Sequence, residues 1–170
     1  DRSLRKLQID TIDVLLVHRP DWLTRADDTA EGLQRVIHNG KVGSVGVSNY
    51  TTSQFDLLSS CLGNVPATNQ LEVNLFHMDA IDDGTLNQCE QNNIHPTAWS
   101  PLAGGRIMSG EDADAVRTRE TLIAIANELD ATPEQVALSW VSALPSQPQV
   151  IIGTNQPDRI RESAASDSLK

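Results

Sequence analysis

One stretch decides how we interpret the fold of this chain: Val14-Leu15-Leu16-Val17-His18-Arg19-Pro20. Four consecutive apolar residues, two of them β-branched, end abruptly in a histidine, an arginine and a proline. Such a run is typical of a strand buried on both faces of a parallel sheet, and Pro20 cannot extend it. Residue alternation places His18 on the face of Val14 and Leu16, at the carboxyl end of the strand. Parallel α/β folds hold their functional residues at that end, so His18 is the first candidate site residue.

Length and composition indicate one ordinary globular domain over residues 1–170, with 39% hydrophobic and 21% charged residues. The net charge of −10 argues against a nucleic-acid partner, since phosphate binding needs clustered Lys and Arg. No apolar run approaches the ~18 residues of a membrane span, so no membrane partner is expected. Two cysteines, Cys61 and Cys89, favour a cytoplasmic, reducing location. The chain begins with Asp1 rather than Met, which suggests a fragment.

Short apolar segments recur along the chain and alternate with helical patterns. After the first strand at residues 12–18, we expect strands at residues 42–49, 67–73, 97–102 and 150–152. Capping-box patterns predict helix starts at residues 28–31, 51–54 and 132–135, and Asn39-Gly40 predicts a helix end. One further helix is expected over residues 81–91.

Alternating strands and helices of this kind predict a parallel sheet with right-handed crossovers. Polar or glycine-rich residues follow nearly every strand, as they do on the active face of an α/β barrel. A closed barrel needs eight βα units and typically ~250 residues. The five units predicted here therefore describe a barrel whose first part is missing.

Several ordered motifs together resemble the aldo-keto reductase family, in its bacterial oxidoreductase branch. They are Asp13-Val14-Leu15-Leu16-Val17-His18-Arg19-Pro20-Asp21, Gly40-Lys41-Val42, Gly46-Val47-Ser48-Asn49, Thr68-Asn69-Gln70-Leu71-Glu72, Trp99-Ser100-Pro101-Leu102, and Ile151-Ile152-Gly153-Thr154-Asn155 with Arg159-Ile160. The resemblance implies an α/β fold of the (β/α)8 TIM-barrel type, of which this chain would supply strands 4 to 8 with their helices.

The resemblance also implies an activity, namely hydride transfer from NADPH to a small aldehyde or ketone. In the family, a tyrosine acid is assisted by lysine, aspartate and histidine. Only the histidine has a match here, His18, which would orient the substrate carbonyl by hydrogen bonding. The other three positions would lie upstream of Asp1, and the sole tyrosine, Tyr50, does not match the catalytic position. We therefore expect little turnover from the 170-residue chain alone. The alternative for His18 is a structural role, as a hydrogen-bonded histidine of the core.

The same resemblance assigns residues to the nicotinamide end of NADP(H). Ser48, Asn49 and Gln70 resemble the groups that hold the carboxamide, which needs both donors and acceptors. Trp99 resembles the aromatic residue under the nicotinamide ring. The alternatives are turn and cap roles for Ser48 and Asn49, and a core role for Trp99.

Two further segments resemble the phosphate-binding parts of the cofactor site. The pyrophosphate loop would be formed by Ser100, Leu102, Gly104 and Arg106, because small residues let backbone N–H groups approach phosphates. The adenosine 2′-phosphate would be bound at the last helix by Gly153, Thr154, Asn155 and Arg159. Thr154 and Gln156 stand where a lysine is often found, so NADP is favoured over NAD mainly by Arg159.

No metal site is expected, because His38 and His95 fall in separate elements. A substrate pocket or ordinary loop packing could use the residues just beyond the strand ends, namely Trp22, Asn74, Phe76, His77 and Met78. The alternative to an enzyme is a non-catalytic half-barrel that binds nucleotide or self-associates. An incomplete barrel exposes strand edges and, we expect, an apolar inner face. A second copy of the chain or a missing N-terminal half would cover that opening.

Overall fold

The computed structural model describes residues 1–169. Parallel strands form one five-stranded sheet whose spatial order follows the sequence. The strands are β1 (Ile12–Val17), β2 (Val42–Ser48), β3 (Asn69–Glu72), β4 (Thr97–Trp99) and β5 (Gln149–Val150). The helices are α1 (Arg2–Leu7), α2 (Ala26–His38), α3 (Thr52–Leu62), α4 (Asp79–Asp82), α5 (Thr85–Gln91), α6 (Arg106–Ser109), α7 (Ala113–Leu129), α8 (Pro133–Ser142) and α9 (Pro157–Ala164), with 3-10 turns η1 (Ala103–Gly105) and η2 (Ala165–Ser168).

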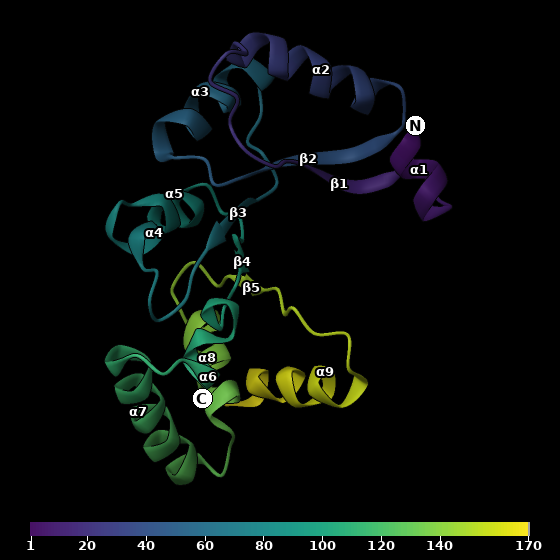
Figure 1. Cartoon of the computed structure of the whole chain (residues 1–170). Helices are drawn as coiled ribbons and strands as arrows, with labels where there is room; N and C mark the ends of the chain where they lie inside the picture. The colour runs from purple at the N-terminus through teal and green to yellow at the C-terminus, as the bar shows by residue number, and fades with distance from the viewer. Residues whose placement is uncertain (170) are drawn as a thin grey trace.

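The molecule is a crescent whose inner side is open (Figure 1). Helices α2, α3, α4, α5 and α8 lie along the outer side of the sheet, while the region between β1 and α9 is uncovered. Strands β1 and β5 each have a neighbour on one side only, so the sheet does not close. Five parallel βα units of this order form an incomplete α/β barrel, which confirms the predicted fold class.

Two of the predicted capping boxes are confirmed, and they explain where α3 and α8 begin. Thr51 Oγ1 accepts from the Gln54 N–H, and the Gln54 side chain accepts from the Thr51 N–H. Thr132 and Gln135 make the same reciprocal pair at α8. Each pair satisfies two backbone donors that the first helical turn leaves unpaired.

The capping box predicted at residues 28–31 is wrong. Helix α2 begins at Ala26, after Arg25 in an extended conformation, and its cap makes no side-chain hydrogen bond. Asp27 and Asp28 therefore lie inside the first turn, where the positive end of the helix dipole favours carboxylates. The predicted end at Asn39-Gly40 is confirmed, with Gly40 at φ +67°.

The strands predicted over residues 67–73 and 150–152 are found at Asn69–Glu72 and Gln149–Val150. Two other predicted elements are interrupted by a residue with positive φ. The strand predicted over residues 97–102 ends at Trp99, since Ser100 adopts φ +55° and turns the chain into η1. The helix predicted over residues 81–91 is two short helices, α4 and α5, separated by Gly84 at φ +83°.

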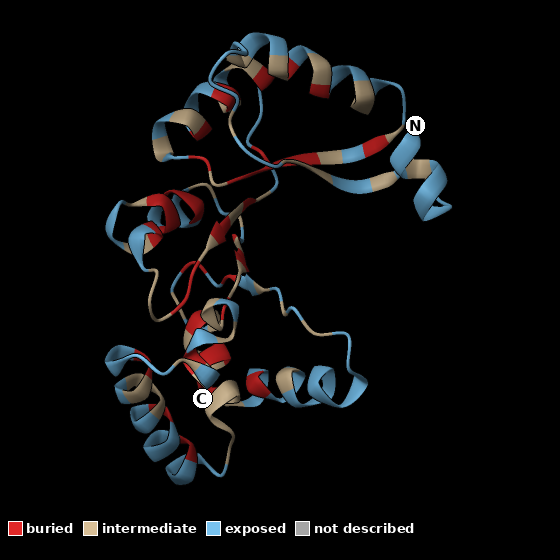
Figure 2. Ribbon diagram, in the orientation of Figure 1, coloured by how far each residue is buried: buried red, intermediate tan, exposed pale blue. Residues whose placement is uncertain are grey.

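The hydrophobic core lies between the sheet and the outer helices (Figure 2). On the outer face of the sheet Val47 and Ala98 are fully buried, and Phe55 and Leu58 of α3 pack in the same layer as Val47. Long apolar side chains removed from water in this layer supply most of the stability of the chain.

The inner face is more polar than the sequence predicted. Leu16 pairs in register with Gly46, and beside them Thr68 Oγ1 and Thr97 Oγ1 lie 3.1 Å apart. A Cβ on Gly46 would come 2.6 Å from Leu16 Cδ2 and 2.9 Å from the Thr68 carbonyl oxygen, so only glycine fits there. The expected continuous apolar face is therefore interrupted by hydroxyl groups.

The expectation that the first strand is buried on both faces is wrong. Asp13 and Val14 are exposed, and Val14 retains 44% of its accessible surface. The reason is position, because β1 forms one edge of the open sheet and nothing covers its inner face. Within residues 1–169, no helix has the length and apolarity needed to cross a membrane.

Candidate functional site

A hydrogen-bonded chain joins the carboxyl ends of β2, β3 and β4. Ser48 Oγ donates to the Gln70 carbonyl oxygen at 2.9 Å, and Asn49 Nδ2 donates to Ser48 Oγ at 2.6 Å. Trp99 Nε1 donates to Asn49 Oδ1 at 3.1 Å. The structure thus brings together four residues that the sequence assigned to the nicotinamide end of the site. The alternative turn role of Asn49 is also real, because its φ is +56°.

Asn69, one residue before Gln70, holds the turn that follows Asn49. Its side chain is fully buried, donates to the Tyr50 carbonyl oxygen at 2.9 Å and accepts from the Tyr50 N–H. The Tyr50 ring packs into the helix-side core, and burial raises the pKa of its hydroxyl group. Tyr50 therefore points away from the open inner side, in agreement with its exclusion as an acid.

Gln70 is the amide that remains available for a ligand. Both polar groups of the Asn49 side chain are engaged, by Ser48 and by Trp99. The half-buried Gln70 side chain makes no hydrogen bond within residues 1–169. A primary amide with a free donor and a free acceptor can pair with a carboxamide of the same shape.

His18 follows β1 directly and is exposed, so the core-histidine alternative does not apply. Its neighbour Arg19 reaches across to β4, where the guanidinium carbon lies 5.8 Å from the centroid of the Trp99 ring. This is cation–π geometry, and it brings the end of β1 to the same group of residues. The sequence motif contained Arg19, but nothing in its spacing predicted the contact with Trp99.

The loop after β4 is tightly folded. Ser100 Oγ accepts from the Gly104 N–H at 3.0 Å, and Ala103, Gly104 and Gly105 all have positive φ. A Cβ on Gly104 would meet nothing within 4 Å, so its outer side is open to a ligand. Arg106, which follows Gly105, does not face this space. Its guanidinium donates twice to Asp112, at 2.7 and 3.0 Å, and stacks on the Phe76 ring.

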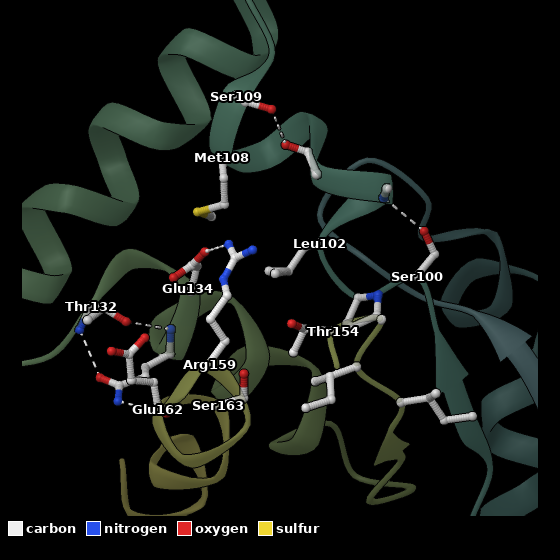
Figure 3. A pocket seen from close by; sticks show the side chains of 17 residues that line it. Ser100, Leu102, Met108, Ser109, Thr132, Glu134, Thr154, Arg159, Glu162 and Ser163 are labelled. Atoms are coloured by element: carbon white, nitrogen blue, oxygen red, sulfur yellow. Dashed lines mark hydrogen bonds and ion pairs between the residues drawn. The ribbon is translucent and has the colours of Figure 1, made fainter. Parts of the chain in front are cut away.

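A cavity of about 630 Å³ lies between this loop, the start of α8, the segment after β5 and α9 (Figure 3). It is lined by six of the residues assigned to cofactor phosphates, namely Ser100, Leu102, Gly104, Gly153, Thr154 and Arg159. Arg106 and Asn155 are not among its lining residues, so the structure does not group these two with the others.

Two glutamates that the sequence did not single out also line the cavity. Arg159 Nη2 donates to Glu134 Oε1 at 3.1 Å, and Glu162 lies close by on α9 (Figure 3). Gln135 Nε2 donates to the Glu162 carbonyl oxygen at 2.9 Å and so ties α8 to α9. The sequence pattern of residues 132–135 predicts only a helix cap. No local pattern signals a contact between residues 25 positions apart.

Among the residues expected in a substrate pocket or in loop packing, the structure assigns a role to Asn74. Asn74 is fully buried and hydrogen-bonds to Ser100 and Phe76, so it has the loop-packing role. Trp22 is 89% exposed and remains free to contact a ligand. Within residues 1–169, no group of three or more His, Cys, Asp or Glu side chains is placed to hold a metal ion.

A parallel α/β sheet with polar residues at the carboxyl ends of its strands, beside a cavity, is the arrangement in which α/β-barrel proteins hold their functional sites. The model of the Aldo/keto reductase family matches residues 1–169. The chain belongs to the aldo-keto reductase family.

Curated relatives and solved structures agree with this assignment. The chain is 42% identical over 171 residues to Oxidoreductase YdhF of Escherichia coli and covers 57% of that protein. It is 37% identical over 170 residues to the 6-dehydroglucose reductase of Agrobacterium fabrum and covers 56% of it. In both comparisons the match spans 100% of this chain.

The thermostable aldo-keto reductase Tm1743, solved with the inhibitor epalrestat, superposes with a TM-score of 0.85 at 26% identity, covering 99% of this chain and 58% of that one. An aldo/keto reductase of Klebsiella pneumoniae, solved with NADP and acetate, superposes with a TM-score of 0.77 at 29% identity, covering 96% and 56%. The chain thus spans a little over half the length of the proteins that it matches.

Proposed function

We propose that this chain forms the cofactor-binding part of an NADPH-dependent reductase of aldehydes and ketones. The observation that carries the proposal is the cavity, which is lined both by Ser100, Leu102 and Gly104 of the loop after β4 and by Gly153, Thr154 and Arg159. Family membership supports oxidoreductase chemistry, and the bound NADP of the Klebsiella pneumoniae relative supports the choice of nucleotide.

The residues present fit such a cofactor. Gln70 has a free amide for the carboxamide, Trp99 offers a ring face, and the cavity contains Arg159 for a phosphate group. Reduced nicotinamide supplies the hydride that reaches the carbonyl carbon. His18, exposed at the end of β1, would orient the carbonyl oxygen by a hydrogen bond.

The proton for the carbonyl oxygen needs a further group. The only tyrosine, Tyr50, is buried on the helix side of the sheet. We therefore propose that the isolated 170-residue chain binds NADPH without appreciable turnover.

Calorimetric titration of the purified chain with NADPH tests the proposal. Saturable binding that weakens at least about tenfold in Arg159→Gln would support it, since charge-assisted hydrogen bonds to phosphate are among the stronger polar contacts. Absence of binding, or binding unaffected by that substitution, would contradict it. A carbonyl-dependent loss of NADPH absorbance at the rate of an ordinary reductase would contradict the proposal that the isolated chain has no appreciable turnover.

A second proposal concerns what covers the inner side. Strands β1 and β5 each leave one edge unpaired, and Val14 and Ile151 are 44% and 40% exposed there. Such edges pair readily with another chain. We propose that a second copy, or an N-terminal half of the barrel, covers the opening. Light scattering combined with intact-mass spectrometry should show twice the 18.5 kDa of one chain, and a monodisperse monomer would rule out the second copy.

A further inference from the structure

The cavity contains more negative than positive side chains. Arg159 is the one lysine or arginine among the described residues that line it, whereas Glu134 and Glu162 both contribute carboxylates. The side chains of Arg159 and Glu134 are 54% and 31% exposed, so solvent screens their charges only in part. A phosphate group entering the cavity therefore meets an arginine that is already partnered and a net negative lining.

The partner of Arg159 lies at the start of α8. Glu134 is in the first turn of this helix, directly after Pro133 and inside the Thr132–Gln135 capping box. Its side chain is 31% exposed, against 54% for Arg159. The hydrogen bond from Gln135 to the Glu162 carbonyl oxygen is a second link between α8 and α9. The ion pair thus joins these two helices at the cavity.

We propose that Glu134 sets how well this cavity distinguishes a 2′-phosphate from a 2′-hydroxyl group on an adenosine ribose. Its carboxylate competes with a 2′-phosphate for Arg159 and repels it, but it can accept a hydrogen bond from a 2′-hydroxyl group. Glu134 therefore lowers the ratio of the affinity for NADP(H) to the affinity for NAD(H), so that the chain binds NAD(H) as well. This inference rests on the proposed function only in taking an adenosine nucleotide as the ligand.

The test uses two small probes of the cavity, adenosine 2′,5′-bisphosphate and AMP, titrated calorimetrically into the 170-residue chain. We expect Glu134→Gln to bind the bisphosphate about three- to tenfold more tightly than the unchanged chain, and AMP no more tightly. The matched control is Asp158→Asn, which removes one charge from a 2.6 Å ion pair with Arg161, also on α9 but outside the cavity lining. This control should leave the preference for the bisphosphate unchanged.

Three results would overturn the inference: equal effects of the two substitutions, no effect of Glu134→Gln, or no binding of the bisphosphate to any variant. Unfolding midpoints confirm that each variant is folded. A different result would count against the proposed function alone. In that result, Glu134→Gln tightens binding of the bisphosphate as expected, but NADPH binds with no higher affinity than the bisphosphate.

Discussion

The two halves of the candidate site are built differently. At the ends of β2, β3 and β4, the residues Ser48, Asn49 and Trp99 hydrogen-bond to one another and to the backbone. At the cavity, Arg159 is paired with an acid of the chain itself, Glu134. Arg106, outside the cavity lining, is paired with Asp112 in the same way. Ser48 is 2% exposed, whereas the side chains of these two ion pairs are 31–54% exposed.

This difference separates two ways of preparing a binding site. The strand-end half is organised before any ligand binds, so its geometry depends on packing and hydrogen bonds inside the fold. The cavity half must exchange an internal ion pair for a ligand contact, so its affinity depends on a competition between charges. Substitutions should therefore affect stability mainly in the first half and selectivity mainly in the second.

The largest effect is expected from Gly46→Ala, which places a methyl group against Leu16 and the Thr68 backbone. Overpacking of this kind should lower the free energy of unfolding by about 3 kcal/mol. Gly32→Ala is the matched control, because a Cβ at this position in α2 meets nothing within 4 Å. Removal of a helical glycine should stabilise the chain by about 0.5–1 kcal/mol. Urea unfolding measures both, and equal effects would contradict the account.

The next largest effect is expected from Asn49→Ala, because it removes the hydrogen bonds that link Ser48 to Trp99 and places alanine at φ +56°. We expect a loss of about 2 kcal/mol in the free energy of unfolding. Asn49→Gly tolerates that φ and should lose only the hydrogen-bond part, about 1 kcal/mol, by the same urea measurement. Both variants should bind adenosine 2′,5′-bisphosphate as the unchanged chain does. Weakened binding of this probe would show that the two halves are not separate.

The smallest effect concerns the Arg106–Asp112 pair and appears in its pH dependence. The hydrogen bonds from Arg106 and from the Ala115 N–H hold the pKa of Asp112 well below its ordinary value. A depressed folded-state pKa stabilises the folded chain above the unfolded pKa of about 3.9, and this stability is lost as the pH falls through the folded value.

Asp112→Asn keeps the N-cap of α7 but removes the charge. It should therefore cost stability at pH 7, and the difference from the unchanged chain should shrink below about pH 4. Chemical unfolding of both chains at pH 7 and below pH 4 gives the two differences in the free energy of unfolding. A difference that is independent of pH would show that the ion pair contributes nothing.

The sequence predicted the order of the strands and the presence of polar residues after them, because both follow from local patterns. Apolar runs indicated the buried strands, and the residues directly after Val47 and Ala98 lie at the site for that reason. Residue alternation also placed His18 at the open end of β1. What the resemblance added was the assignment of Ser48, Asn49, Gln70 and Trp99 to one part of the site, and of Ser100 and Thr154 to another. Ser100 and Thr154 both line the cavity.

The sequence did not predict features that depend on distant residues. The pairing of Glu134 with Arg159 and the contact of Arg19 with Trp99 join elements whose approach is set by tertiary packing. Burial of β1 was wrongly predicted, since a strand pattern does not show whether a neighbour is present. The break at Gly84 was missed because one glycine inside a helical pattern is ambiguous.

One NADPH molecule bound across both halves of the site would contact Trp99 as well as Arg159, and tryptophan fluorescence detects the contact with Trp99. In a Trp22→Phe/Trp140→Phe chain, Trp99 is the only remaining tryptophan. Titration with NADPH should quench its emission saturably, whereas adenosine 2′,5′-bisphosphate should bind by calorimetry without quenching it. Equal quenching by both ligands, or saturable NADPH binding that leaves Trp99 emission unchanged, would contradict the account.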